Sequence, residues 1–517
     1  MNVEKEYDYI IIGSGFGGSV SALRLSEKGY KVLVIEKGKW YTSKDFPKSN
    51  WNLKKWLWIP FLNWFGIMKM TFFKHVVVAS GTGVGGGSLV YANTLPVPKS
   101  EFFTSGSWAN LEDWQTLLQP YYDTALRMLG AQKNPKLFDG DNALHELAKE
   151  MNIKNNFEET DVAVFFGTPN VTVPDPYFKG KGPDRTGCNY CGGCMTGCRF
   201  GAKNTLDKNY LYLAQQLGAE ILAEHEVFDV IPTKKGYEVK FKSSTTFFKV
   251  KKTIQTKGVV FSGGVLGTVK LLLKLKKKSL PKISDRLGHD IRTNNESLIS
   301  VTNLDGTKNL SQGIAIGSIL KTDKNSHLEI VRYAKGSGFW RLSHLPLTHG
   351  KNSVIRVVKM LTSFVTHPLA YIKLYTVKDW GKSTVVLLFM QTLDSTLTFT
   401  RNSFGMMNTK IADGKKPSAF IPQSLDLAKR YAKLIKGKET VFALEPLAGI
   451  PSTAHILGGA VMGSDTSNGV IDKNNRVFGY QDMYICDGSM ISANPGVNPS
   501  LSITAISEHA MSLIPDK

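Results

Sequence analysis

The N-terminal part of the chain carries the pattern that most restricts its fold. Residues 9–12 form a short apolar run of the kind found in buried parallel strands. Gly13, Gly15 and Gly18 follow as Gly-x-Gly-x-x-Gly, and after them come a helical stretch, a second apolar run and Glu36. This order predicts a βαβ unit that binds a dinucleotide, with the pyrophosphate at the glycine turn and the ribose hydroxyls on the acid. The motif does not distinguish FAD from NAD.

Length and charge narrow the class of protein. A chain of 517 residues is too long for one ordinary core, so at least two domains are expected. The formal net charge is +21, but the lysines are dispersed and no zinc-finger, arginine-rich or RNA-binding signature accompanies them. We therefore expect no nucleic-acid partner. Acidic residues precede a short first apolar run, which is not the pattern of a signal peptide, so we expect a cytoplasmic protein.

Two further stretches are rich in glycine. Five glycines fall within the seven positions 81–87, which disfavours a helix or strand interior and indicates backbone lying against a flat or charged ligand. Near the other end of the chain, residues 454–463 read AHILGGAVMG. Residues 484–510 then read as a strand, an Asp-Gly turn, a Pro/Gly/Asn loop and a helix.

Together, these motifs resemble the glucose–methanol–choline flavin oxidoreductases, and within them the cholesterol-oxidase branch. The resemblance covers nearly the whole chain in the same order, including GVGGGSLV at 83–90, VVFSGGVLGT at 259–268 and the DGS…GVNPS pattern at 487–500. It implies FAD as the cofactor. It also implies oxidation of an alcohol by hydride transfer to the flavin.

The resemblance also implies which residues form the site. His455 and Asn498 match the pair that holds the substrate hydroxyl, and a neutral imidazole can accept its proton. Ile456 departs from the proline that the family commonly has after the histidine. The positions matched to FAD binding are Gly13, Gly15, Gly18, Glu36, Gly83, Gly85, Gly86, Ser88, Val227, Asp487, Gly488 and Ser500.

Cholesterol oxidases also shift a double bond, which requires a carboxylate above the steroid. Glu329 is the candidate, because alternation along its strand places it on one face with Val331 and Tyr333. The alternative is a solvent-facing carboxylate beside Arg332. Residues 313–320, 383–390 and 395–401 read as strands of a sheet that would roof the flavin and accept a bulky apolar substrate.

These elements predict an α/β protein of two interleaved domains. A Rossmann-like FAD-binding domain would take residues 1–295 and 440–517, with the cysteine-rich segment 186–200 inside it. An α+β substrate domain built on a mostly antiparallel sheet would take residues 296–439.

Four of the five cysteines lie within eleven positions of that segment. Cys188, Cys191, Cys194 and Cys198 form C-x2-C-x2-C-x3-C, the spacing of a ferredoxin-type run, although Arg199 replaces the usual proline. Three hypotheses remain open: an iron–sulfur cluster, another metal or redox-active thiols, and no cofactor at all. The resemblance does not decide among them.

Two apolar segments carry lysines and aromatic rings, at 51–73 and 361–380. The first is either a buried flap or a segment that docks on lipid headgroups, and delivery of a sterol from a bilayer would fit both segments. The first hypothesis for function is a sterol 3-hydroxyl oxidase that uses O2, with or without isomerase activity. The second is a dehydrogenase of lipid or long-chain alcohols with another acceptor, and the third is a membrane-peripheral flavin electron carrier.

Overall fold

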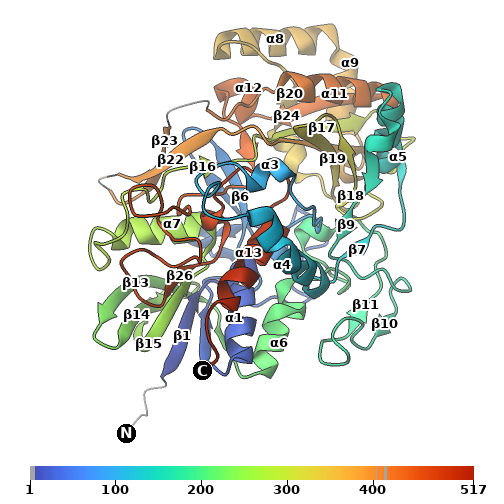
Figure 1. Cartoon of the computed structure of the whole chain (residues 1–517). Coiled ribbons are helices and arrows are strands. Elements are labelled where there is room, and N and C mark those ends of the chain that lie inside the picture. Colours follow the sequence, from blue (N-terminus) through green and yellow to red (C-terminus); the bar gives the residue numbers. More distant parts are fainter. Residues whose placement is uncertain (1–5, 403, 413–415) are drawn as a thin grey trace.

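The computed structural model describes residues 6–402, 404–412 and 416–517. Two large sheets dominate it, one in the lower and one in the upper part of Figure 1, with helices packed on both. The lower sheet has the order β12-β2-β1-β15-β14-β13, and β26 also pairs with β15. Its strands are β1 (Tyr7–Ile12), β2 (Val32–Ile35), β12 (Glu220–Leu222), β13 (His225–Thr233), β14 (Gly236–Ser243), β15 (Lys251–Phe261) and β26 (Met483–Ile485).

The lower sheet contains the predicted βαβ unit. β1 pairs in parallel with β2 and with β15, whereas β13, β14 and β15 form an antiparallel meander, so the sheet is mixed. The chain turns at Gly13, whose φ of 104° favours glycine, and α1 (Phe16–Glu27) begins after Gly15. A Cβ atom on Gly18 would lie 2.1 Å from the Gly13 carbonyl oxygen, so only glycine lets helix and turn pack this closely.

The upper sheet has the order β20-β24-β17-β21-β19-β18-β8, and every neighbouring pair in it is antiparallel, as predicted. One face buries an apolar core against α5 (Asp139–Glu150) and α11 (Pro422–Leu434). The opposite face turns toward the lower half of the molecule. Its strands are β8 (Phe157–Glu159), β17 (Ser297–Asn303), β18 (Ile316–Lys321), β19 (Ser326–Arg332), β20 (His344–Pro346), β21 (Thr384–Gln391) and β24 (Gly437–Phe442).

One of the three strands expected in this sheet lies elsewhere. β22 (Thr396–Arg401) pairs with β16 (Ile291–Arg292) and β23 (Met407–Ile411) in a separate three-stranded sheet. Alternation within a strand predicts which face is buried but not which partner it pairs with. The division of the chain into domains at 295 and 440 stays a prediction.

The C-terminal helix lies in the core of the lower half. α13 (Ser500–Ser512) runs through the centre of Figure 1 and packs against α1 and α4 (Trp114–Met128). Most of its residues are buried, including polar ones such as Thr504, Glu508 and His509. Its N-terminus, at the end of the Pro/Gly/Asn loop, reaches the space between the two sheets.

Candidate active site

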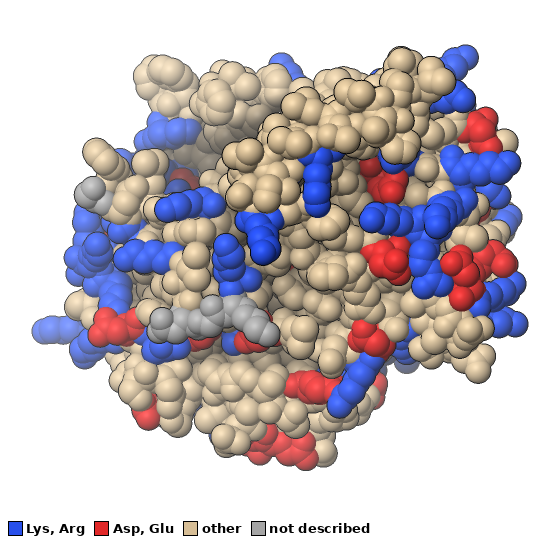
Figure 2. Space-filling model, turned by 90° about the horizontal axis from the view of Figure 1, so that it is seen from above, with Lys and Arg blue, Asp and Glu red and all other residues tan. Residues whose placement is uncertain are grey.

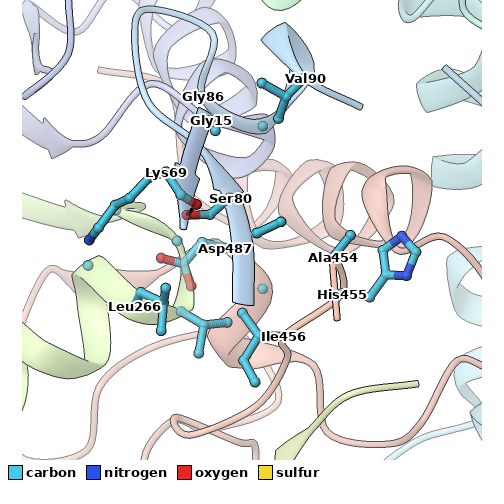
Figure 3. Close-up of a pocket in the computed structure, with 18 of the residues that line it drawn as sticks. Gly15, Lys69, Ser80, Gly86, Val90, Leu266, Ala454, His455, Ile456 and Asp487 are labelled. Atoms are coloured by element: carbon cyan, nitrogen blue, oxygen red, sulfur yellow. Dashed lines mark hydrogen bonds between the residues drawn. The ribbon is translucent and has the colours of Figure 1, made fainter. Parts of the chain in front are cut away.

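A cavity of about 700 Å³ lies between the two sheets. The glycine turns of the lower sheet line one part of it, and strands β17, β18, β19 and β21 line another. Figure 3 shows Gly15 and Gly86 together near Ser80 and Asp487, with His455 at the opposite side from Lys69. The motifs near both ends of the sequence therefore meet around one cavity.

The glycine-lined part has the shape that a dinucleotide requires. Gly86 has a φ of 52°, and a Cβ atom on it would lie 2.7 Å from the Gly15 Cα, so the two glycine loops touch backbone to backbone. The buried Glu36 carboxylate accepts hydrogen bonds from the Ser14 amide at 3.1 Å and the Gly38 amide at 2.8 Å. Backbone amides thus hold this acid at the end of β2 with one edge facing the cavity.

The second stretch of predicted cofactor residues forms another wall. The Asp487 carboxylate accepts hydrogen bonds from the Ser489 amide at 2.8 Å and from the Thr268 hydroxyl at 2.5 Å. Burial raises the pKa of Asp487 above its ordinary value. Among the residues that the structure describes, the buried Asn498 Oδ1 and Ser500 Oγ atoms have no hydrogen-bond partner, although both residues line the cavity. Such atoms are available to a bound molecule.

His455 is held by a carboxylate that the sequence motifs did not reveal. Its Nδ1 atom lies 2.9 Å from Glu296 Oε2, and the Glu296 side chain is buried. Because a carboxylate only accepts, Nδ1 carries the hydrogen and Nε2 is the free acceptor. The other carboxylate oxygen accepts hydrogen bonds from the Thr453 hydroxyl and, at 3.0 Å, from the Ala454 amide.

Glu296 also controls the charge of the imidazole. Burial disfavours the imidazolium, but the charge and hydrogen bond of Glu296 outweigh this, so the pKa of His455 is raised above its ordinary value. Asn498 Nδ2 lies 3.5 Å from His455 Nε2. The amide thus makes a long hydrogen bond to the imidazole nitrogen. A substrate hydroxyl that entered between them could donate to Nε2 and accept from Nδ2.

Glu329 lies on the predicted face of β19. Leu328 and Ile330 pack into the core beneath the sheet, whereas Val331 and Tyr333 line the cavity. Glu329 is fully buried and interacts electrostatically with His455, although it does not itself line the cavity.

The buried Glu329 carboxylate forms no hydrogen bond with the described residues. Its Oε1 atom is 3.5 Å from His327 Nε2, an ion-pair distance, and within the described ranges neither carboxylate oxygen has a hydrogen-bond partner. Arg332, the neighbour considered in the alternative interpretation, pairs with Asp141 instead, at 2.8 Å. Glu329 is therefore not a solvent-facing carboxylate.

The part of the cavity facing the upper sheet is mainly apolar, with His344 and the Tyr333 hydroxyl as polar groups. The hydroxyl groups of a polar, sugar-sized ligand would lose their hydrogen bonds to water there and find few partners in the wall. A hydrocarbon makes no hydrogen bonds to water, so its burial there is favourable. The apolar residues that line this part are Met195, Leu298, Ile316, Val331, Tyr333, Trp340, Val386, Leu388 and Phe442.

Most predicted site residues line this cavity, and the rest support it. Those that line it are Gly13, Gly15, Glu36, Gly86, Val227, His455, Asp487, Gly488, Asn498 and Ser500. Ser88 is buried behind it, accepts from the Leu206 amide at 3.1 Å and donates to the Gly85 carbonyl at 2.7 Å. Gly18 and Gly83 lie in the packed turns beside it, where a Cβ atom would meet neighbouring atoms.

The four clustered cysteines lie around a separate small pocket. All five cysteines are free thiols. Among the described residues, no group of three or more His, Cys, Asp or Glu side chains could hold a metal ion.

Comparison with known proteins identifies the family. The N-terminal sequence model of the GMC oxidoreductases matches residues 7–287, and the C-terminal one matches residues 436–507. The chain belongs to the GMC oxidoreductase family. A cholesterol oxidase of Acinetobacter baumannii is 42% identical to it over 99% of this chain and 95% of the relative. A cholesterol oxidase of Mycobacterium tuberculosis is also 42% identical, over 100% of this chain and 92% of the relative.

More distant relatives differ in the alcohol that their names record. A 2-methyl-1,2-propanediol dehydrogenase of Mycolicibacterium austroafricanum is 24% identical over 97% of this chain and 94% of its own length. The crystal structure of pyridoxine 4-oxidase from Mesorbium loti has a TM-score of 0.62, with 14% identity and 98% of each chain covered, which supports the fold alone. This GMC oxidoreductase is an FAD-dependent enzyme that oxidises alcohols. The touching glycine loops, the amide-held Glu36 and the unpartnered atoms at 498 and 500 fit that cofactor.

Proposed function

We propose that this enzyme oxidises the 3-hydroxyl group of a sterol, with the hydroxyl bound between His455 and Asn498. The observation that carries the proposal is the apolar wall of the upper sheet, which faces these two polar groups across one cavity. A sterol has this distribution of chemistry, one hydroxyl on a large hydrocarbon. The cholesterol oxidases that are 42% identical over nearly the whole chain support the same substrate class.

Each polar side chain has a task in this proposal. Nε2 of neutral His455 accepts the hydroxyl proton, while Glu296 fixes the tautomer and stabilises the imidazolium that forms. Asn498 Nδ2 donates to the substrate oxygen as negative charge develops on it. FAD, when bound, supplies the acceptor for the hydride. The intact histidine, carboxylate and amide favour alcohol oxidation over the electron-carrier hypothesis.

The cofactor would be held by the residues at the glycine-lined part of the cavity. Glu36 would accept the ribose hydroxyls, and Val227 would lie against the adenine. The glycine loops would approach the pyrophosphate, and Asp487 and Gly488 would contact the ribityl chain. Gly18, Gly83, Gly85 and Ser88 would act by keeping the loops in place.

Glu329 would perform the double-bond shift. A buried carboxylate without hydrogen-bond donors can take a proton from one carbon of the sterol and return it to another. Glu329 lies on the same face of β19 as Val331, and Val331 forms part of the cavity wall. The steroid nucleus would therefore extend from His455 along the upper sheet.

A lipid surface would supply the substrate. Helices α8 (Ser353–Thr366) and α9 (Pro368–Thr376) lie at the top of Figure 1, and one stripe of apolar side chains on them is exposed. The stripe consists of Val354, Val358, Leu361, Val365, Leu369 and Ile372.

The charges around this stripe are complementary to an anionic membrane. Residues 341–378 contain no Asp or Glu, and Lys351, Lys359 and Lys373 are exposed among them. Figure 2 shows Lys and Arg side chains distributed over this face around its central hollow. We propose that α8 and α9 lie on lipid headgroups with the stripe in contact with the acyl chains. No helix among the described residues is long and apolar enough to cross a bilayer.

The other lipid-contact candidate, residues 51–73, divides between core and surface. Trp56 is buried against Phe339 and Trp340, whereas Phe61 and Phe72 are exposed by 85% and 61%. The exposed rings would support contact with the same membrane.

The decisive experiment is anaerobic mixing of the FAD-loaded enzyme with cholesterol in detergent. Bleaching of the flavin absorbance, followed by peroxide release on admitting air, supports a sterol oxidase that uses O2. If only long-chain alcohols bleach the flavin, or if only dyes reoxidise it, the enzyme is a lipid-alcohol dehydrogenase and the sterol-oxidase proposal is wrong.

A further inference from the structure

Three lysines line one part of the large cavity. Lys37 follows the end of β2, Lys69 lies on β5 (Met68–Phe72), and Lys270 lies on α7 (Gly264–Leu275). The positive charge of Lys37, burial and the charge of Lys270, in that order of size, lower the pKa of Lys69 to about 7. Three distant segments of the chain therefore bring like charges together at this cavity wall.

Among the residues that the structure describes, the three ammonium groups form no hydrogen bond or ion pair. Glu226 acts in the opposite direction on the pKa of Lys69, but it lies 3.9 Å from Lys242, another cation of the same cavity. The Glu36 carboxylate is held by backbone amides instead. A cluster of unpaired cations in a partly enclosed site favours an anionic ligand.

Lys69 lies next to the two glycine loops. It pairs across a hairpin with Ser80, one position before Gly81. A Cβ atom on Gly81 would lie 2.5 Å from the Gly86 carbonyl oxygen, and Gly86 in turn touches Gly15. The hairpin, the second glycine loop and the turn before α1 therefore form successive layers.

Lys37 approaches from the side of the acid that is expected to hold the ribose. It comes directly after Glu36, and a Cβ atom on the next residue, Gly38, would clash with the Gly83 amide nitrogen. This segment therefore packs against the same second glycine loop as the hairpin that carries Lys69.

Lys270 approaches from α7. It lies four positions after Leu266, so both side chains stand on one face of the helix, and both line the cavity. Figure 3 shows the Lys69 side chain extending from beside Ser80 toward the side of the cavity where Leu266 lies. The three lysines therefore reach one region of the cavity from three different elements.

We propose that Lys69, together with Lys37 and Lys270, binds the diphosphate of FAD. In FAD the diphosphate links the ribose to the ribityl chain, and the residues expected to hold these two groups, Glu36 and Asp487, line the same cavity. The glycine loops and the N-terminus of α1 offer amide donors to the phosphates, and the lysines add the full positive charge that amides lack. Loading of FAD would also offset the mutual repulsion of the lysines.

The first test follows the release of FAD from the loaded enzyme after dilution at low salt, by the rise in flavin fluorescence. Lys69→Met removes the charge but keeps an unbranched side chain, so FAD should leave about 10-fold faster than from wild type. Lys69→Arg keeps the charge, and its release rate should stay within about threefold of wild type. Lys74→Met is the matched control, because Lys74 is exposed in the turn of the same hairpin and outside the cavity, and it should release FAD at the wild-type rate.

Three results of this test would overturn the proposal. If Lys69→Met retains FAD as long as wild type does, the ammonium does not hold the cofactor. If Lys69→Arg releases FAD as fast as Lys69→Met, the shape of the side chain and not its charge is responsible. If Lys74→Met releases FAD as fast as Lys69→Met, the net charge of the protein and not the cluster is responsible.

The second test uses inorganic pyrophosphate and calorimetry on the full-length wild-type protein. We expect protein freed of FAD to bind pyrophosphate at low salt and FAD-loaded protein not to bind it. Equal binding by both forms would mean that the lysines serve a free anion, and no binding by the FAD-free form would mean that they recognise no diphosphate, so either result overturns the proposal. Neither test contains an alcohol, so a failure of the sterol-oxidase proposal would leave both results unchanged.

Discussion

Replacing Glu296 by glutamine is expected to slow alcohol oxidation and to shift its pH dependence. Glutamine keeps the size of the side chain but removes the charge 2.9 Å from His455 Nδ1. A hydrogen bond to a charged partner is worth about 1.5–3 kcal/mol. Since about 1.4 kcal/mol corresponds to a tenfold change in rate, kcat/KM should fall about 10- to 100-fold.

The direction of the pH shift follows from the charge. Glu296 favours the imidazolium and so raises the pKa of His455. The base must be neutral to accept a proton, so activity rises with pH as His455 loses its proton. Without the carboxylate that pKa falls, and the rising limb of the kcat/KM profile should move to lower pH while its plateau drops.

The assay is flavin reduction by cholesterol under anaerobic conditions, measured across pH. Glu445→Gln is the matched control, because Glu445 is buried outside the cavity and burial raises its pKa well above the ordinary value, so the neutral amide replaces a neutral acid. The control should leave plateau and limb unchanged. If the rising limb of the kcat/KM profile of Glu296→Gln stayed at the wild-type pH, the electrostatic role given to this residue would be refuted, whatever the height of the plateau.

Three further predictions concern the isomerase base, the lipid surface and the cofactor loop. Glu329→Gln should leave the rate of flavin reduction within about threefold of wild type but abolish formation of the conjugated ketone, which is followed by its ultraviolet absorbance. Formation of the conjugated product at the normal rate would contradict the assignment. The double substitution Leu361→Asp, Val365→Asp should reduce sedimentation with anionic vesicles about 10-fold or more. The exposed control Leu217→Asp, directly after α6 (Tyr210–Gln216) at the other end of the molecule, should not, and equal losses would argue against the stripe. Gly86→Ala should weaken FAD binding by the apoprotein about 10-fold, because its Cβ atom would push against Gly15, and unchanged affinity would contradict the close approach of the loops.

Local patterns in the sequence were enough to predict the nucleotide-binding half. The βαβ unit depends on residues within about thirty positions of one another, so apolar runs, glycines and the terminal acid indicate it directly. The same holds for the alternation in β19, which placed Leu328 and Ile330 on the core side and Val331 on the cavity side.

Contacts between distant segments could not be predicted in this way. Glu296 lies 159 positions before His455 and stands in the unremarkable run TNNESLIS, so no motif connects the two. Likewise β22 has the alternation of a sheet strand, but its pairing with β16 and β23 depends on how the chain crosses between the halves. The convergence of four cysteines on one pocket was also beyond their spacing alone, which is compatible with two separate sites.

The central claim is that His455 takes the hydroxyl proton of a sterol beside a bound flavin. The most direct measurement is the rate of anaerobic flavin bleaching by cholesterol in wild-type enzyme and in His455→Ala, both loaded with FAD. A general base contributes about 10²- to 10⁴-fold, so bleaching should slow by at least 100-fold while the flavin stays bound. Equal bleaching rates in the two proteins, or a protein that takes up no FAD, would contradict the account.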